Sequence, residues 1–549
     1  MARSRMSKKR LLLVIGGKWH PFERCGEIVG QLVETTGRYA LDVTSDLGAL
    51  KAASIKKYDA VLVYTCGGNL TGEQERGLVD FVKAGGACIG IHSAVAFGRR
   101  NAAYIDMLGG VFASHGPIQE IPVAIADPEA MITQRIPDFR ITDELYILKK
   151  FDPARVRILA TALWKGKAQP IAYTRDYGKG KVFYLALGHD ERALTHPAFG
   201  KMLLRGVDWA LGRAPRKPLK AGVIGYGAAF NMGKHHLESL RDAAGFVPAA
   251  VCDSDPARRD AAVADFPEVR TFASVKQMLD KSDVDLVVVI TPHNTHARLA
   301  IQCLNAGRHV VTEKPFCISV KEADAVIAAA RKNQRMLSVF HNRRWDGDYM
   351  TIKDIMARGL LGDVFQIEAC MGGYRHHGYW WRSEKRISGG AFYDWGAHIV
   401  DWVLGLVPAK IAEVSGHFQE KRVWHDVTNE DHCNAVVRFD NGCAATIELS
   451  HIAAIGKPRW RILGTLGALV EAQDKFQIVT YKEGVRLDSH VEYLASDWHA
   501  YYRDVANHLV LDEPLAVTPE SARRVIAVIE TAEKSSRARR ALKPPTHCA

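Results

Sequence analysis

The stretch KAGVIGYG, residues 220–227, decides the fold of the second half of the chain. It is a short apolar run that ends in glycine, tyrosine and glycine, the pattern of a buried strand followed by a tight turn into a helix. Three more apolar runs follow, with room for a helix between neighbours: VPAAVCDSD (247–255), VDLVVVITP (284–292) and RHVVTEKP (308–315). This alternation predicts a doubly wound parallel sheet with helices on both faces over residues 220–342.

The first part of the chain alternates in the same way. Its strand-like runs are LLLVIGG (11–17), YDAVLVYT (58–65), GACIGIHS (86–93) and KVFYLALGHD (181–190), separated by amphipathic stretches. They predict a separate α/β domain over residues 10–212. The following LGRAPRKPLK (211–220) has two prolines, four basic residues and no apolar periodicity, so we place a linker at 213–219.

From about residue 343 the pattern changes to longer strand-like segments in succession. Examples are VFQIEACMG (364–372), IAEVSGHF (411–418) and RWRILGTLGALVEAQ (459–473), and Asp440-Asn441-Gly442 reads as a hairpin turn. We predict an α+β region with a large, mostly antiparallel sheet over residues 343–536, followed by a basic tail at 537–549. The whole chain is thus α/β with a C-terminal α+β part.

Composition narrows the class of protein. The 549 residues are 47% hydrophobic and 24% charged, as in well-cored globular proteins. The net charge of +12 is spread along the chain apart from its two ends, and neither end interleaves aromatic residues, so we expect no nucleic-acid partner. No run approaches the length of a membrane span, and the ten cysteines lack metal-ligand spacing. We expect a cytoplasmic protein with reduced thiols, no membrane partner and no metal.

The glycine-rich turn predicts a dinucleotide site. Gly225 would permit the tight turn, and Gly227 and Ala228 would let backbone amides approach a pyrophosphate at the helix N-terminus. Phe230 stands where this fingerprint expects Gly or Ala, so the loop would be longer, with Gly233 providing the close packing. An acidic residue at Asp253 would bind the adenosine ribose diol and favour NAD over NADP, although a role in capping the next helix is the alternative.

Further motifs carry a family resemblance. Thr291, Pro292 and His296 follow one strand, and Glu313-Lys314-Pro315 follows the next. With the glycine turn, Asp253 and the later ISGGAFYDWGAHIVD (387–401), this order resembles the Gfo/Idh/MocA oxidoreductase family from about residue 220 to 536. The resemblance implies a Rossmann NAD-binding domain, with Thr291, Pro292, His296, Glu313 and Lys314 near the cofactor.

The resemblance also implies a catalytic set of Lys314, Asp394 and His398. The residue types fit, because Asp394 and His398 share one face of a helix, and a histidine is a suitable general base for a hydroxyl proton. Lys314 would stabilise the reacting oxygen, and Asp394 would orient the substrate or the imidazole. The alternative is a solvated lysine and a surface ion pair.

Polar and aromatic residues are dense between 341 and 386, as in carbohydrate pockets, where rings stack on sugars and Arg or His bind hydroxyls. A dimer interface has the same composition, and relatives of this family commonly associate through the large sheet, so we expect a homo-oligomer, a dimer or tetramer. The predicted substrate residues are His341, Arg343, Tyr374, His377, Trp381 and Arg382.

The first domain resembles the ThuA-like (trehalose utilisation) family, which shares the flavodoxin-like class I glutamine amidotransferase fold. The resemblance rests on GGKWHPF (16–22), the stretch at 64–94, ASHG (113–116), TDELY (142–146) and GKGKVFYLALGHD (178–190). At the turn where amidotransferases carry a nucleophilic cysteine this chain reads Gly90-Ile91-His92-Ser93, so thiolate chemistry through Cys88 is not expected. Substrate binding or acid/base chemistry, a metal site and a structural remnant remain open for His20, His92, Ser93, His115, Asp143, Glu144, His189 and Asp190.

These features predict an NAD-dependent oxidoreductase acting on a hydroxyl of a sugar or glycoside, forming a 3-keto sugar, fused to a domain that binds or processes the carbohydrate. One alternative is an NAD-dependent glycoside hydrolase that oxidises its substrate transiently, eliminates the aglycone and shows no net redox change. Another is a non-enzymatic sensor of sugar and dinucleotide.

Overall fold

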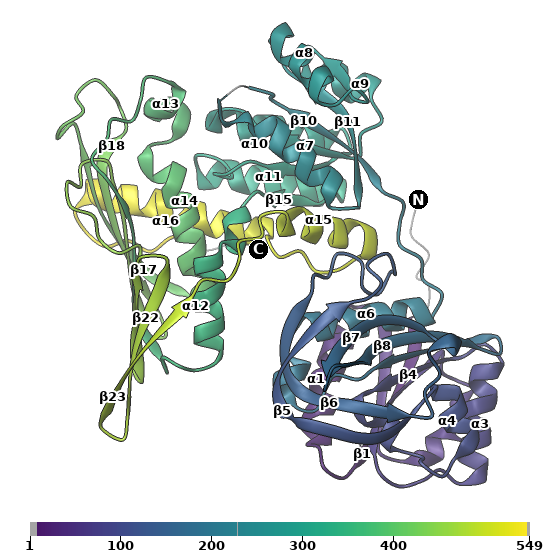
Figure 1. Ribbon diagram of the computed structural model, residues 1–549. Coiled ribbons are helices and arrows are strands. Elements are labelled where there is room, and N and C mark those ends of the chain that lie inside the picture. The colour runs from purple at the N-terminus through teal and green to yellow at the C-terminus, as the bar shows by residue number, and fades with distance from the viewer. Residues whose placement is uncertain (1–7, 228, 546–549) are drawn as a thin grey trace. The chain divides into compact units, whose positions relative to one another are not determined.

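The computed structural model describes residues 8–227 and 229–545, and the chain divides into two compact units that meet between Arg216 and Lys217 (Figure 1). This boundary falls inside the segment predicted to be a linker. Within the described residues, no helix combines the length and the apolar character needed to cross a bilayer.

The first unit is built on a nine-stranded sheet of order β2-β1-β3-β4-β9-β8-β7-β5-β6. The β2-β1-β3-β4-β9 part is parallel, and the remaining pairs are antiparallel. Strands β3 and β4 are buried along their whole length, as expected for central parallel strands covered on both faces. The strands are β1 (Lys9–Gly17), β2 (Tyr39–Thr44), β3 (Ala60–Cys66), β4 (Ala87–Ile91), β5 (Val111–Ile125), β6 (Phe139–Lys149), β7 (Arg157–Trp164), β8 (Lys167–Tyr177) and β9 (Gly180–Leu185).

Six α-helices belong to this unit, and its apolar core is continuous from β1 to the last helix. Thr71 caps α3 by accepting the Gln74 N–H, and the Gln74 side chain accepts the Thr71 N–H in return. The helices are α1 (Phe22–Thr35), α2 (Ala52–Ile55), α3 (Gly72–Lys83), α4 (Ala102–Leu108), α5 (Glu191–Leu194) and α6 (Pro197–Ala210).

The second unit begins with a six-stranded, fully parallel sheet of order β12-β11-β10-β13-β14-β15. The strand order reverses between β10 and β13, and open α/β sheets bind ligands beyond the carboxyl ends of their strands at such a point. The elements are β10 (Leu219–Ile224), α7 (Met232–Asp242), β11 (Phe246–Cys252), α8 (Pro256–Asp265), β12 (Arg270–Phe272), α9 (Val275–Lys281), β13 (Leu286–Val289), α10 (His296–Asn305), β14 (His309–Thr312), α11 (Val320–Asn333) and β15 (Leu337–Val339).

An eight-stranded sheet follows, of order β17-β18-β19-β16-β20-β21-β22-β23, in which only β16 and β19 run parallel. This confirms the mostly antiparallel sheet, and the predicted turn at Asp440-Asn441-Gly442 joins β18 to β19, with Gly442 at φ +87°. The strands are β16 (Val364–Gly372), β17 (Ile411–Glu420), β18 (Glu430–Phe439), β19 (Ala444–Ser450), β20 (Trp460–Gly464), β21 (Gly467–Ala472), β22 (Lys475–Lys482) and β23 (Val485–Glu492).

Helices join the two sheets of the second unit into one body with a continuous apolar core. Helix α14 is buried on most of its surface and packs against α16 and β19, which explains why its sequence is apolar apart from a few functional candidates. The helices are α12 (Gly347–Ala357), α13 (Lys385–Ser388), α14 (Ala391–Leu406), α15 (Ala500–Leu511) and α16 (Pro519–Ala538).

Candidate functional site

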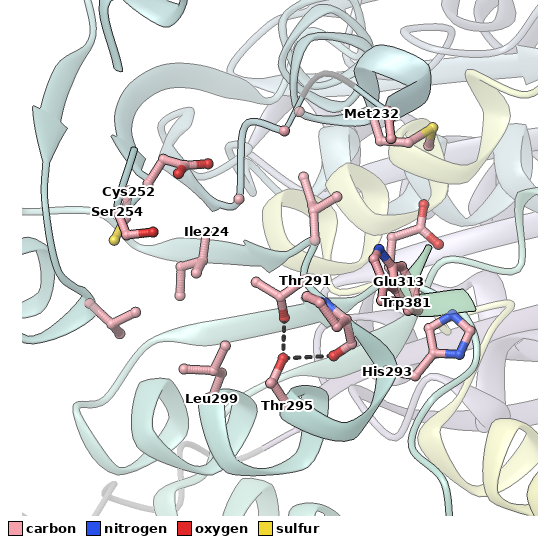
Figure 2. A pocket seen from close by; sticks show the side chains of 18 of the residues that line it. Ile224, Met232, Cys252, Ser254, Thr291, His293, Thr295, Leu299, Glu313 and Trp381 are labelled. Carbon is pink, nitrogen blue, oxygen red and sulfur yellow. Dashed lines mark hydrogen bonds between the residues drawn. The ribbon is translucent and has the colours of Figure 1, made fainter. Parts of the chain in front are cut away.

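A cavity of about 480 Å³ lies at the carboxyl ends of β10, β11, β13 and β14 (Figure 2). Gly225 has φ +101°, and a Cβ added there would collide with the carbonyl oxygen of Ile290, so only glycine fits. A Cβ at Gly227 would meet nothing within 4 Å, which leaves its backbone open to a ligand. The loop therefore fits a pyrophosphate approaching the backbone, as a nicotinamide dinucleotide requires. Ala228, also predicted to contribute, lies outside the described residues.

The loop is longer than the usual fingerprint. Phe230 and Asn231 both adopt left-handed backbone angles, with φ +62° and +49°, before α7 begins at Met232. A Cβ at Gly233 would lie 2.6 Å from the Tyr226 ring, so Gly233 provides the close helix–strand packing expected of it.

Asp253 and Asp255, which follow β11, have different roles. Asp255 is the N-cap of α8 and accepts the N–H of Ala257 at 2.9 Å. Asp253 lines the cavity, and its carboxylate is oriented by the N–H groups of Tyr226 at 2.7 Å and of Asp255 at 2.9 Å. The carboxylate is thus held in place without serving as the helix cap, which suits recognition of a ribose diol.

Thr291 and Pro292 line the cavity at the end of β13. Thr295 donates its hydroxyl hydrogen to the Pro292 carbonyl oxygen at 2.7 Å, so Thr291 must donate to Thr295 across 2.6 Å (Figure 2). His296 does not line the cavity: its two ring nitrogens lie 2.8 Å from the carbonyl oxygens of Thr291 and Pro315. His296 therefore holds two cavity loops together and does not face the cofactor.

Glu313 and Lys314 follow β14 and both line the cavity. The Glu313 carboxylate accepts the Lys314 N–H at 2.7 Å and lies 3.1 Å from Nε2 of His236, so it fixes the loop against α7. The Lys314 ammonium lies 2.5 Å from Oδ1 of Asp394 on α14. Lys314 thus connects the cavity with Asp394 on α14.

Asp394 is shared by two cations. Arg382 Nη1 donates to both of its carboxylate oxygens, at 3.1 and 3.3 Å, in addition to the Lys314 contact. Burial favours a higher pKa for Asp394, but Lys314 and Arg382 outweigh it and hold the pKa below its usual range. Asp394 is therefore a permanent carboxylate that positions two cations.

His398 lies one helical turn after Asp394 and is 5% exposed. Burial and the positive charge of Lys314 hold the pKa of His398 well below its usual value. Its Nδ1 is buried without a hydrogen-bond partner. His398 is thus a neutral imidazole with an unused nitrogen, able to receive a proton only when a substrate provides one at close range.

Of the predicted substrate residues, Trp381 and Arg382 line the cavity, where the Arg382 guanidinium lies 5.2 Å from the Trp381 ring centre. His341 is buried with its ring 6.1 Å from that of His398. Arg343 is placed between the rings of Trp395 and Trp498, at 5.3 and 4.5 Å.

Tyr374 and His377 do not line this cavity, and neither do His341 and Arg343. Tyr374 is 58% exposed beside Trp424. The His377 ring stacks 3.9 Å from that of His451, and its Nε2 lies 3.8 Å from Asp431. The predicted substrate set is therefore only partly brought together, since Trp381 and Arg382 line the cavity and the other four residues do not.

In the first unit, β4 ends in the turn that carries His92. This residue has φ +41°, a conformation that costs energy for a side chain other than glycine, and it is fully buried. Its Nδ1–H donates to the Ala186 carbonyl oxygen at 2.6 Å, and its Nε2 is left without a partner. Burial raises the pKa of the nearby Cys88 thiol to about 12, which agrees with the expectation that no thiolate acts here.

Three histidine rings from different loops converge at this turn. The ring centres of His20, His92 and His189 are 4.7 to 5.5 Å apart, and each pair of rings is close to perpendicular. Glu144 of β6 approaches the same point, with Oε2 3.2 Å from His189 Nδ1 and 3.8 Å from His92 Nε2. His115 Nδ1 lies 2.8 Å from the other oxygen of Glu144.

The remaining predicted residues of this unit have supporting positions. Asp143 is buried and accepts the N–H groups of Gly188 and His189, at 2.7 and 3.0 Å, so it shapes the turn that presents His189. Asp190 is the N-cap of α5. Ser93 is buried and does not line the cavity of about 890 Å³ that opens in front of His20 and His189.

Comparison with protein families agrees with this geometry. Residues 10–210 match the ThuA family (trehalose utilisation), residues 219–341 match the NAD-binding Rossmann domain of the GFO_IDH_MocA oxidoreductase family, and residues 349–470 match a C-terminal domain of that family. The chain is a ThuA-like domain fused to a Gfo/Idh/MocA oxidoreductase. Its cofactor is NAD.

Relatives of this fusion protein include two inositol dehydrogenases. The scyllo-inositol 2-dehydrogenase (NADP(+)) IolW of Bacillus subtilis is 25% identical over 60% of this chain and 97% of its own length. The myo-inositol 2-dehydrogenase of Thermotoga maritima is 24% identical over 59% of this chain and 98% of its own length. The crystal structure of an NAD-binding protein from Listeria innocua, 27% identical, covers 60% of this chain and 97% of that one with a TM-score of 0.54.

One cavity residue of the Gfo/Idh/MocA unit was missed from the sequence. His293 is 2% exposed, donates Nδ1–H to the Ser388 carbonyl oxygen at 2.8 Å and leaves Nε2 without a partner. Its ring meets that of Trp381 edge-on at 4.8 Å (Figure 2). Its place in the loop directly after an apolar strand was the available signal, since that loop also holds Thr291 and Pro292.

Proposed function

We propose that the Gfo/Idh/MocA unit oxidises a secondary hydroxyl on the ring of a sugar or glycoside, giving a 3-keto sugar and NADH. The observation that carries the proposal is the position of Lys314, which lines the cofactor cavity and pairs with Asp394 at 2.5 Å. A cation at this place is suited to an alcohol oxygen that gains negative charge as it becomes a carbonyl oxygen.

NAD, held by the glycine loop and Asp253, supplies the hydride acceptor when bound. Lys314 donates a hydrogen bond to the reacting oxygen, while Asp394 fixes the ammonium in place. His398, which burial keeps neutral, receives the hydroxyl proton on its unpartnered Nδ1. The C–H bond and the O–H bond of one CH–OH group are thus broken, and two electrons leave as hydride.

The substrate class follows from the cavity wall and the relatives. Trp380, Trp381 and Arg382 form one side of the cavity, and aromatic faces with a guanidinium suit a ring that carries hydroxyls. Two relatives are named for oxidising an inositol, which is a six-membered ring of secondary alcohols. In this proposal the ThuA-like unit binds or processes the keto sugar, and the chains associate as a homo-oligomer through the large sheet.

The test uses a panel of nitrophenyl glycosides and inositols with the full chain and NAD. The proposal expects NADH in proportion to substrate consumed, with activity abolished in Lys314→Ala. Release of nitrophenol with no net NADH would replace it with the redox-neutral glycoside hydrolase. A Lys314→Ala chain that still performs its biological role would instead favour a sensor.

A further inference from the structure

His20, His92 and His189 converge at one point of the ThuA-like unit. One nitrogen of each ring lies within 4.8 Å of the corresponding nitrogens of the other two. His92 Nε2 is buried there and lacks a hydrogen-bond partner, while His189 Nδ1 lies 3.2 Å from the Glu144 carboxylate and His20 Nε2 lies 3.5 Å from the Tyr146 hydroxyl. Buried polar atoms are ordinarily paired, so the His92 nitrogen calls for a ligand.

We propose that His20, His92, His189 and Glu144 form a binding site for a divalent first-row transition metal such as Zn²⁺, Co²⁺ or Mn²⁺. Imidazole and carboxylate are ligands that such metals accept together, whereas Ca²⁺ and Mg²⁺ prefer oxygen ligands alone. The proposal concerns the ThuA-like unit and does not depend on the dehydrogenase reaction of the other unit. A metal site is one of the three alternatives that the sequence leaves open for these residues.

Spacing supports the ligand set. Ligand atoms about 2.0–2.1 Å from a tetrahedral zinc ion lie about 3.3 Å from one another. Glu144 Oε2 is 3.2 Å from Nδ1 of His189 and 3.8 Å from Nε2 of His92, which is close to that spacing. The histidine nitrogens, which lie within 4.8 Å of one another, need to close by at most about 1.5 Å when the metal binds.

Outer contacts already orient the ligands. His92 donates Nδ1–H to the Ala186 carbonyl oxygen at 2.6 Å, and His20 donates Nδ1–H to the His189 carbonyl oxygen at 3.3 Å. Metal-bound histidines typically donate the second ring N–H in this way, which fixes the other nitrogen as the ligand. His115 holds the second carboxylate oxygen of Glu144 at 2.8 Å.

The backbone adds a further observation. His92 is buried at φ +41° at the end of a central strand, and non-glycine residues kept in this conformation cluster at functional sites. His20, Glu144 and His189 also line the cavity of about 890 Å³. The other residues that line this cavity include Trp19, Asn69, Arg99 and Arg100. The metal would therefore present a coordination position to an oxygen donor, namely water or a hydroxyl or carbonyl group of a polyhydroxylated ligand.

The experiment begins with the full chain treated with a chelator and dialysed. Zn²⁺ is titrated by calorimetry, and Co²⁺ is added separately to record the visible absorption of the bound ion. We expect one equivalent of metal per chain, with affinity reduced at least about 100-fold in each of His20→Asn, His92→Asn and His189→Asn, and about 10- to 100-fold in Glu144→Gln.

His196→Asn is the matched control. This histidine is in the same unit and caps α6 by accepting the N–H of Ala198, a role that asparagine also performs. Metal binding equal in the native chain and in the His20 and His189 variants would overturn the proposal, as would an equal loss in His196→Asn. His20 and His189 are only partly buried, so these variants decide the question if His92→Asn fails to fold by circular dichroism.

Discussion

The Lys314 ammonium and the Asp394 carboxylate, 80 positions apart in the chain, lie 2.5 Å apart and join the cofactor cavity to α14. Lys314 follows a strand of the parallel sheet, whereas Asp394 is on a helix that packs against the second sheet. This ion pair therefore joins the cofactor cavity of the parallel sheet to the helix on which we propose that the substrate is bound.

Replacing Lys314 with methionine tests the role of the ammonium. We expect kcat to fall about 10²- to 10³-fold, because the oxygen that gains charge loses its donor, while NAD binding measured by fluorescence changes little. Lys314→Arg is the control, because arginine keeps a positive charge beside Asp394 and so preserves the ion pair. A Lys314→Met chain with unchanged kcat would exclude the proposed role.

Arg382 is expected to organise the substrate wall. Its guanidinium lies over the rings of Phe230, Trp380 and Trp381 at 5.0 to 5.3 Å and also donates to Asp394. Lysine can keep the charge but not the planar stack, so both Arg382→Lys and Arg382→Ala should raise the KM for the sugar by about tenfold or more. If Arg382→Lys behaves as the native enzyme in steady-state kinetics, stacking is not what binds the substrate.

Much of the fold was predictable from local patterns. Parallel strands buried on both faces read as continuous apolar runs, and glycine turns and the Asp440-Asn441-Gly442 hairpin mark where the chain changes direction. The positions of Gly225, Asp253 and Lys314 follow from the same logic, since ligands of parallel sheets lie beyond strand ends.

Other features depend on contacts between distant segments. No local pattern indicates that His296 would turn both nitrogens to backbone carbonyls, or that Tyr374 and His377 would not line the cavity. The convergence of His20, His92 and His189 likewise joins residues from three loops up to 169 positions apart. Residue spacing therefore argued against a metal, because spacing rules detect only ligands that share a helix or a turn.

Asp253 should set the preference for the cofactor. Asparagine in its place lacks the charge that repels a 2′-phosphate, and it accepts hydrogen bonds from the ribose hydroxyls less well. We therefore expect the KM for NAD to rise about tenfold and the ratio of kcat/KM for NAD to kcat/KM for NADP to fall. Asp255→Asn, which retains the cap of α8, is the control. Equal NAD to NADP ratios in native and Asp253→Asn chains would assign the preference to another group.

His293 should make the stability of the Gfo/Idh/MocA unit depend on pH. Burial, with a smaller effect of the neighbouring His296 ring, lowers the pKa of His293 from its usual 6.5 to about 3. Below pH 6.5 His293 is therefore protonated in the unfolded chain but not in the folded chain. The free energy of unfolding falls by about 1.4 kcal/mol per pH unit until the pH reaches the pKa of His293 in the folded chain. Above pH 6.5 this contribution is constant.

His293→Asn removes the titrating group while keeping a donor for the Ser388 carbonyl oxygen. Urea unfolding followed by tryptophan fluorescence should show that the stability advantage of the native chain over this variant shrinks by about 2 kcal/mol between pH 7 and pH 5. The exposed His490 on β23 provides the control, since His490→Asn should run parallel to the native chain at both pH values. An advantage over His293→Asn that is the same at pH 7 and pH 5 would mean that His293 takes up its proton as readily in the folded chain as in the unfolded one. Its unpartnered Nε2 would then need an anionic neighbour such as Asp394 to offset the burial.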